Sequence, residues 1–197
     1  MNQPHRYYFN NLAAQWQNLM PEDKELINYL IRFDVQPGDV VLDAGAGTGR
    51  MTSHILKLVG NQGHVIAQDI ADEMLVHGKQ NTHLKSALWI CDDITSMAFK
   101  NNVFDKIICF SMFPHIQRPE NALQECLRTL KPGGDLLILH TCDSNTLNAF
   151  HETLNAPVKN DRLIPATHLA LLMKAKGFQI KHCEEKSNLY WIHARKP

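Results

Sequence analysis

A glycine-rich turn follows a short apolar run in the segment VVLDAGAGTGRM, and its residue types suit the binding of a small ligand. Gly45, Gly47 and Gly49 alternate with small residues, and Asp43 precedes the first glycine by two positions. Glycine readily adopts positive φ and carries no Cβ, so a ligand can approach the backbone closely. At the carboxyl end of a parallel strand, such a turn predicts a nucleotide-like ligand.

The spacing of the turn separates the candidate ligands. A dinucleotide site needs G-x-G-x-x-G, and Arg50 stands where the third glycine would be. A phosphate-binding P-loop needs G-K-[ST], but Gly49 is followed by Arg50 and Met51. Asp43 would repel a pyrophosphate, whereas it can face an ammonium group. The helix expected over residues 48–59 would direct its positive end at a carboxylate. The spacing therefore disfavours both a dinucleotide and a P-loop nucleotide.

Two further acidic positions follow apolar runs. Asp69 comes twenty residues after Gly49, where a carboxylate is placed to accept hydrogen bonds from ribose hydroxyls. Asp92 ends the next run in CDDITSMAF, and Asp93, directly after it, could take its place as a ligand-binding acid. An ordinary capping or solvated role is the competing interpretation for each acid.

Three histidines lie after later strands. His115 follows the apolar run in CFSMFPHI, His140 ends LLILHT, and His151 lies in the next segment. Each could orient an acceptor or act as a general base, which contributes roughly 10²–10⁴-fold where a proton must leave. His115 could instead be a packing and capping residue. A metal site of His115, His140 and His151 is a further alternative, although no H-x-x-x-H spacing supports it.

The elements that position these residues alternate between strand and helix patterns. We predict strands over residues 39–44, 64–70, 86–93, 104–113 and 135–141, and helices over 48–59, 71–81 and 119–130. The segment KPGG, residues 131–134, is predicted to end the last helix and turn into the fifth strand. This alternation favours an α/β fold with a parallel sheet and helices on both faces.

The two ends of the chain depart from this alternation. After a helix over residues 165–178, two strand-like segments, 179–186 and 189–196, are separated only by Ser187 and Asn188. So short a connection predicts an antiparallel hairpin. Before the first strand, helices over residues 6–19 and 21–33 fit no βα unit. We expect one domain over residues 1–197, in which residues 1–35 are packing helices or a lid over the ligand.

The motif D-x-G-x-G-x-G resembles motif I of class I S-adenosylmethionine (SAM) methyltransferases. CDDITSMAF and LRTLKPGGDLLIL resemble later segments of that family, and the overall pattern is similar to the ubiquinone/menaquinone-biosynthesis type. The resemblance implies a Rossmann-like, seven-stranded α-β-α sandwich and SAM as cofactor, with S-adenosylhomocysteine as product. It implies cofactor-binding residues at Asp43, Gly45, Gly47, Gly49, Asp69, Ile70, Asp92, Asp93 and Ser111, with His140 and His115 as the catalytic candidates.

The composition and motifs of the chain limit the chemical class of the methyl acceptor. Lys and Arg together number 20, as do Asp and Glu, so the formal net charge is zero. The sequence therefore shows no excess of basic residues for binding nucleic acid. The amine-positioning motif [DNS]-P-P-[YFW] is absent, with SMFP in its place. We therefore expect a small-molecule acceptor and SN2 methyl transfer. A non-catalytic SAM-binding regulatory module, a metal-assisted methyltransferase and a nucleotide-dependent oxidoreductase are the alternatives.

The remaining expectations concern the protein's surroundings. No apolar stretch reaches the length of a membrane span, and the N-terminal residues have no signal-peptide pattern. The five scattered cysteines favour reduced thiols. We therefore expect a cytoplasmic monomer or homodimer.

Overall fold

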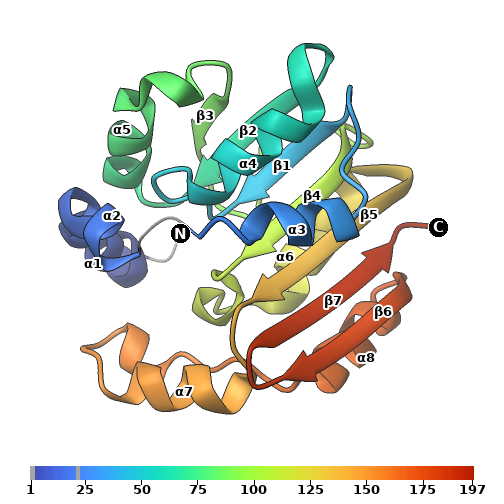
Figure 1. Cartoon of the computed structure of the whole chain (residues 1–197). Helices are drawn as coiled ribbons and strands as arrows, with labels where there is room; N and C mark the ends of the chain where they lie inside the picture. Colours follow the sequence, from blue (N-terminus) through green and yellow to red (C-terminus); the bar gives the residue numbers. More distant parts are fainter. Residues whose placement is uncertain (1–2, 21–22) are drawn as a thin grey trace.

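The computed structural model describes residues 3–20 and 23–197, and its centre is a seven-stranded sheet. The strand order is β3-β2-β1-β4-β5-β7-β6, with helices packed around the sheet (Figure 1). β7 runs antiparallel to both neighbours, and the other pairings are parallel. The predicted fold class, a mostly parallel Rossmann-like sheet with an antiparallel terminal hairpin, is confirmed.

The strands lie close to where the hydrophobic pattern predicts them. Their bounds are β1 Val40–Ala44, β2 His64–Asp69, β3 Leu88–Cys91, β4 Phe104–Phe110, β5 Leu130–His140, β6 Gln179–Lys186 and β7 Leu189–Arg195. The sheet order reverses at β1, because β2 and β3 lie on one side of it and β4 to β7 on the other. The segment after Ala44 therefore occupies the topological switch point, where open α/β sheets bind ligands.

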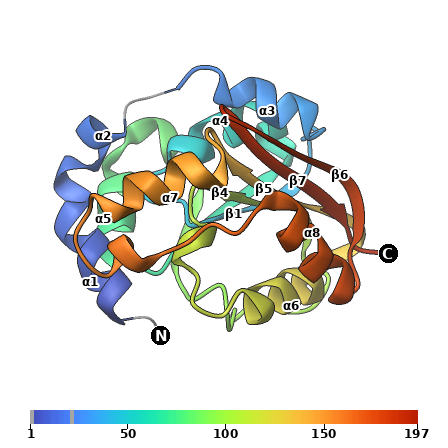
Figure 2. The same cartoon turned by 90° about the horizontal axis from the view of Figure 1, so that it is seen from below.

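The helices cover both faces of the sheet. Their bounds are α1 Gln3–Leu12, α2 Trp16–Leu19, α3 Leu26–Arg32, α4 Arg50–Val59, α5 Asp72–Gln80, α6 Pro119–Thr129, α7 Ser144–Glu152 and α8 Ala166–Ala175. Figure 2 shows α3 and α4 on one side of the strands and α6 and α8 on the other. α4 begins two residues later than predicted, because Gly49 has φ +92° and a left-handed residue does not belong to a right-handed helix.

The prediction for KPGG needs a correction. The structure places residues 131–134 inside β5 rather than in a turn before it. Leu130 pairs with Phe104, and Asp135 pairs with Lys106, so the extra residues form an irregularity in the ladder. Gly134 sits there because a Cβ would lie 2.9 Å from the backbone oxygen of Asp105. β5 thus begins directly after α6, and the glycines lie in a bulge near its start.

The N-terminal region also differs from the sequence prediction. The single helix expected over residues 6–19 is divided into α1, a 3₁₀ turn at Ala13–Gln15 and α2. The second expected helix is shorter, as α3, and its predicted start at Pro21 lies outside the described residues. α3 belongs to the core rather than to a lid, because Leu26, Leu30 and Phe33 pack with α4 against the sheet. α1 and α2 instead lie beyond the carboxyl ends of the strands (Figure 1).

Apolar side chains fill the space on both faces of the sheet. In β1, Leu42 and Ala44 join the layer that contains α6 and α8, whereas Val41 joins the layer that contains α3 and α4. This alternation explains why the central strands are apolar at successive positions. Over the ranges that the structure describes, no helix combines the length and the apolar character needed to cross a membrane.

Candidate functional site

A cavity lies at the carboxyl ends of β1, β2 and β4, where the glycine turn faces it. Asp43, Gly45 and Asp69 line the inner side, and Phe9 and Trp16 line the side formed by the N-terminal helices. Its volume is about 180 Å³. Small-molecule sites typically measure roughly 300–1,000 Å³. The N-terminal helices therefore leave less room than a cofactor and an acceptor together require.

Positive φ accounts for two of the three glycines, and close approach to Met112 adds a second reason at Gly45. A Cβ on Gly45 would lie 2.6 Å from Met112 Cβ, and a Cβ on Gly47 would lie 3.4 Å from Trp16 Nε1. Both glycines line the cavity and have positive φ, +71° and +56°. The turn thus presents bare backbone between Met112 and Trp16.

The third glycine has a different environment. Gly49 is not among the described residues that line the cavity, and a Cβ there would lie 2.6 Å from Leu84 Cδ1 and 2.7 Å from Trp89 Cη2. Gly49 is also left-handed, at φ +92°. Packing and helix geometry therefore account for this glycine, and the structure does not bring it to the ligand space.

Hydrogen bonds connect the turn to β2. The backbone N–H groups of Gly45 and Ala46 both donate to the Gln68 carbonyl, and that of Gly47 donates to Asp69 Oδ2 at 2.8 Å. Asp69 Oδ1 accepts from the backbone of Ala71 at 2.8 Å. Burial raises the pKa of Asp69, while these backbone hydrogen bonds oppose the rise. Asp69 therefore holds the turn and faces the cavity at once.

Asp43 is a second carboxylate in the same wall, and it is buried. It is 1% exposed, and Thr52 Oγ1 donates a 2.6 Å hydrogen bond to its Oδ2. Burial raises the pKa of Asp43 to about 7, and the charge of Asp69 contributes to the rise. A cationic group in the cavity would favour the ionised form of this side chain. The structure thus places a buried acid in the wall of the cavity.

The remaining cofactor candidates also reach the cavity. Asp92, Asp93, Ile70 and Ser111 all line it. Asp92 accepts hydrogen bonds from the backbone of Asp93 at 2.8 Å and of Ala98 at 2.9 Å. Asp93 Oδ1 caps the next turn by accepting from the backbone and hydroxyl of Thr95. Both acids shape the loop after β3. Because both also line the cavity, either could contact the nucleobase of a ligand.

Ser111 has a backbone conformation that is uncommon for a residue with a side chain. It follows β4 with φ +53°, and its N–H donates to the carbonyl of Leu139 at 2.9 Å. Residues in this region of φ and ψ are held there by their surroundings and cluster at functional sites. The bend after Ser111 directs Met112 over Gly45 and carries the chain on to His115.

The structure separates the two proposed catalytic histidines. His115 lines the cavity, whereas His140 does not and is 2% exposed, packed edge-on to Tyr190. Burial lowers the pKa of His140 to about 3, and positive charge on His115 and His151 contributes. Its Nε2 has no hydrogen-bond partner among the described residues. His140 is therefore a neutral residue of the protein interior.

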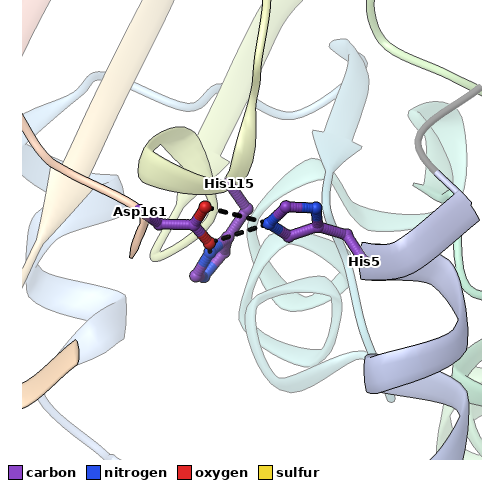
Figure 3. A group of neighbouring side chains, drawn as sticks. All are labelled: His5, His115 and Asp161. Carbon is purple, nitrogen blue, oxygen red and sulfur yellow. Dashed lines mark hydrogen bonds and ion pairs between the residues drawn. The ribbon is translucent and has the colours of Figure 1, made fainter. Parts of the chain in front are cut away.

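His115 belongs to a cluster that sequence analysis did not assemble. Its Nδ1 lies 2.6 Å from Asp161 Oδ2, and His5 Nε2 lies 2.9 Å from each oxygen of the same carboxylate (Figure 3). The His151 ring lies 5.2 Å from the His115 ring, and its Nδ1 contacts the Asp161 carbonyl at 3.3 Å. The set brought together is thus His5, His115 and Asp161, with His151 adjacent and His140 apart.

Sequence reasoning missed several other cavity residues. Arg50, which served only to exclude a dinucleotide, lines the cavity with its guanidinium carbon 4.9 Å from the Phe110 ring centroid. Gln68 also lines it, at 1% exposure. The position of Gln68 directly before Asp69 was a usable signal. His5 gave none, because only the folded chain places it at the strand ends.

The lining fits a nucleoside that carries an amino-acid end. The turn lines the cavity with the Cβ-free backbone of Gly45 and Gly47, and the buried Asp43 and half-buried Asp69 lie in the same lining. Gln68 Oε1 and Nε2 are buried and have no hydrogen-bond partner within the described part of the chain. Because unpaired buried polar atoms are unfavourable, a polar ligand here would stabilise the site.

Comparison with known proteins shows similarity to methyltransferases in the central part of the chain. The sequence model of the family described as "Methyltransferase domain" matches residues 41–134. The ubiquinone/menaquinone biosynthesis C-methyltransferase UbiE of Ruegeria sp. (strain TM1040) is 33% identical over 108 residues. That match covers 53% of this chain and 43% of the relative, so the chain matches less than half of the length of this curated protein.

Solved structures match nearly the whole chain. A SAM-dependent methyltransferase from Aquifex aeolicus has a TM-score of 0.76 at 20% identity, with 94% of this chain and 98% of that chain covered. The [4+2]-cyclase SpnF has a TM-score of 0.71 at 18% identity, with coverage of 88% and 80%. These likenesses concern the fold, and the second neighbour is named for a different reaction. The reaction must therefore be argued from the site.

Proposed function

We propose that this chain, whose residues 41–134 are a methyltransferase domain and whose fold is that of class I SAM-dependent methyltransferases, transfers a methyl group from SAM to a small molecule. The observation that carries the proposal is a pair of acids, the buried Asp43 and the half-buried Asp69, in the wall of a cavity lined by Gly45 and Gly47. This arrangement suits a cofactor with a cationic amino-acid end and a ribose.

Each part of the cofactor has a partner in the cavity. Asp43 pairs with the ammonium group, and Arg50 provides a positive charge for the carboxylate. Asp69 accepts hydrogen bonds from the ribose hydroxyls, as the acid at this strand end does in related folds. Asp92 or Asp93, in the loop after β3, meets the adenine.

The protein's part in the reaction is mainly positioning. SAM supplies a methyl group on a positively charged sulfur, which is already an activated leaving group. Met112 and Phe110 give the acceptor side an apolar wall, and Trp16 covers the glycine turn, so that water is excluded. Orientation of two reactants in such a site contributes several kcal/mol, on the order of 7–11 in the best cases.

Of the two histidines predicted to act on the acceptor, His115 has the better position. It lines the cavity, whereas the burial of His140 keeps that imidazole neutral and away from the lining. We therefore propose that His115 faces the acceptor and that His140 serves packing. Asp161 orients His115 through the 2.6 Å contact to Nδ1, which leaves Nε2 as the other polar atom of the ring.

The acceptor is proposed to be small and partly apolar. The curated relative is named for ubiquinone and menaquinone biosynthesis, but this chain matches only 43% of its length. The cavity of about 180 Å³ requires the N-terminal helices to move before an acceptor can enter. A lid formed by α1 and α2 would open for exchange and close for reaction.

Calorimetry and a methyl-transfer assay on the full chain test this proposal. SAM and S-adenosylhomocysteine should bind with a stoichiometry of one, and saturation at a hundredfold excess over Kd should stabilise the fold by about 2.7 kcal/mol. Labelled methyl groups should then appear on members of a phenol, thiol and amine panel. Absence of binding would contradict the proposal. Binding without transfer to any acceptor would favour a non-catalytic SAM-binding module.

A further inference from the structure

Three side chains from distant parts of the sequence meet at the edge of the cavity. His5 lies in α1, His115 follows β4, and Asp161 lies between α7 and α8. One ligand atom from each residue lies within 4.8 Å of the other two. Their side chains are 4%, 17% and 10% exposed, respectively. We call this set the His5–His115–Asp161 cluster, and Figure 3 shows both imidazoles directed at one carboxylate.

We propose that the His5–His115–Asp161 cluster binds a divalent transition-metal ion, such as Zn²⁺ or Co²⁺. Two imidazole nitrogens and one carboxylate oxygen are ligands that these ions prefer. In a tetrahedral site, ligand bonds of about 2.0–2.2 Å place neighbouring ligand atoms about 3.3–3.6 Å apart. The nitrogen–oxygen distances of 2.6 and 2.9 Å are shorter than that spacing, so the side chains would move apart by about 1 Å or less as the ion replaces their hydrogen bonds.

The number of ligands indicates the kind of metal site. Structural zinc sites have four protein ligands, whereas catalytic sites have three and keep a position open for water or substrate. Here three described residues contribute, and two of them, His5 and His115, also line the cavity. The open position therefore faces the space assigned to the acceptor.

Neighbouring groups support the ligand geometry. The His151 ring stacks at a tilt of 31° beside His115, and its Nδ1 lies near the Asp161 carbonyl. Phe9 packs edge-on against the His115 ring, with centroids 5.0 Å apart. Such contacts fix the directions of ligand side chains, as outer-shell residues do in metal sites. The three-histidine set predicted from sequence is thereby changed, with His5 and Asp161 as ligands in place of His140 and His151.

The ion would define the class of acceptor, an inference that rests on the proposed methyl transfer. An acceptor hydroxyl or thiol in the open position ionises more readily, because the cation stabilises the resulting anion. The acceptor proton passes to water, a bond forms between the acceptor oxygen or sulfur and the methyl carbon, and the methyl–sulfur bond of SAM breaks. S-Adenosylhomocysteine leaves with the electron pair of that bond. No oxidant or reductant is required.

The ion would also join the N-terminal helix to the rest of the site. His5 is the ligand from α1, and the other two ligands come from the sheet end and the α7–α8 connection. Binding therefore favours the closed position of α1 over the cavity. The ion thus links α1 to the rest of the domain.

The test uses the full chain, purified without a His tag and stripped with a chelator. Titration calorimetry with ZnCl₂ should give one site, and CoCl₂ should produce the visible absorption of a low-symmetry complex. His5→Ala and Asp161→Asn should each raise the metal Kd by more than about tenfold. His168→Ala, at an exposed position on α8, is the matched control and should bind as the wild type does.

The same preparations separate this inference from the proposed function. SAM binding and near-ultraviolet circular dichroism verify that each variant is folded. Normal SAM binding without stoichiometric metal binding would overturn the metal site and leave the proposed function standing. Metal binding unchanged in both His5→Ala and Asp161→Asn would also overturn the assignment. Metal binding that depends on the cluster, with no SAM binding, would contradict the proposed function alone.

Discussion

The backbone N–H of Gly47 donates a 2.8 Å hydrogen bond to Asp69 Oδ2, so the glycine turn and the acid at the end of β2 form one unit. Asp69 is also bonded to the backbone of Ala71 at the start of the next connection. The residue that we propose to bind ribose thus also holds the glycine turn, which we propose to receive the amino-acid end of the cofactor. Its replacement should affect both at once.

Asp69→Ala is expected to lower SAM affinity by more than about tenfold, the effect of losing a charged hydrogen-bond acceptor worth about 1.5–3 kcal/mol. The free protein should also lose stability, because Gly47 N–H and Ala71 N–H lose their acceptor. Calorimetry with SAM and thermal unfolding measure the two effects. Glu73→Gln, at an exposed position on α5, is the control. Unchanged affinity in Asp69→Ala would place the ribose elsewhere.

SAM affinity is expected to fall as the pH is lowered below about 7. Asp43 has its pKa raised to about 7 by burial, so acidification neutralises the group that pairs with the ammonium. The limiting slope is tenfold per pH unit. Calorimetry between pH 5.5 and 8 measures it, and buffers of different ionisation enthalpy should reveal proton release at pH 7. Asp43→Asn should bind weakly and without this slope. A flat wild-type profile would exclude the pairing.

Acidification should have the opposite effect on the stability of the free protein: the contribution of Asp43 to the free energy of unfolding should increase as the pH is lowered. Because the folded pKa lies above the unfolded value of about 3.9, the stabilisation is complete below pH 4 and is lost as the pH rises through about 7. At pH 8 without SAM, the free energy of unfolding of Asp43→Asn should therefore exceed that of the wild type by about 1–3 kcal/mol, and the variant should melt at a higher temperature. The difference should disappear near pH 4. Equal melting at both pH values would contradict this.

Gly45→Ala is expected to destabilise the protein by more than the effect of its backbone conformation alone. A new Cβ would lie 2.6 Å from Met112 Cβ, and φ is +71°. Gly38→Ala is the matched control, because Gly38 has φ +89° but nothing within 4 Å of a Cβ. We expect about 1–2 kcal/mol for the control and a further 1–3 kcal/mol for Gly45→Ala. Urea unfolding compares the two, and equal losses would show that Met112 moves freely.

Asp135→Asn should destabilise the junction of β5 and β7. Burial alone would raise the pKa of Asp135, but His193, Arg195 and Lys106 hold it well below its usual range. Removing one partner of a buried ion pair costs about 3 kcal/mol. This stability is present above the unfolded pKa of about 3.9 and lost as the pH falls below it. Urea unfolding at pH 7 and pH 3 should show the variant's deficit shrinking on acidification. A constant deficit would indicate lost packing instead.

Trp16→Ala is expected to speed SAM dissociation several-fold. Trp16 covers Gly47 and lines the cavity, so its loss opens the side formed by the N-terminal helices. Stopped-flow measurements of SAM exchange would report the change. Tyr7→Ala is the control, since Tyr7 is 71% exposed on the same segment. Unchanged dissociation would mean that these helices do not act as a lid.

The alternation of strands and helices, the terminal hairpin and the acids at strand ends followed from the sequence. Each depends on local pattern: apolar runs, glycine and proline positions, and connection length. The G-x-G-x-G spacing and Asp43 also sufficed to favour an amino-acid-bearing cofactor over a dinucleotide, because a parallel strand places its next residues at one edge of the sheet. Asp43 and Asp69 lie there in the folded chain.

Tertiary packing decided which histidines lie at the cavity. His5 and Asp161 are separated by 156 positions in the chain yet share a 2.9 Å contact, and local pattern carries no signal of such a meeting. His140 ends its strand as predicted, but packing buried it. Gly49 proved to make room for Trp89 rather than for a ligand. The glycine turn depends on interactions between near neighbours, whereas the histidine cluster depends on how three distant segments pack, which only the folded chain determines.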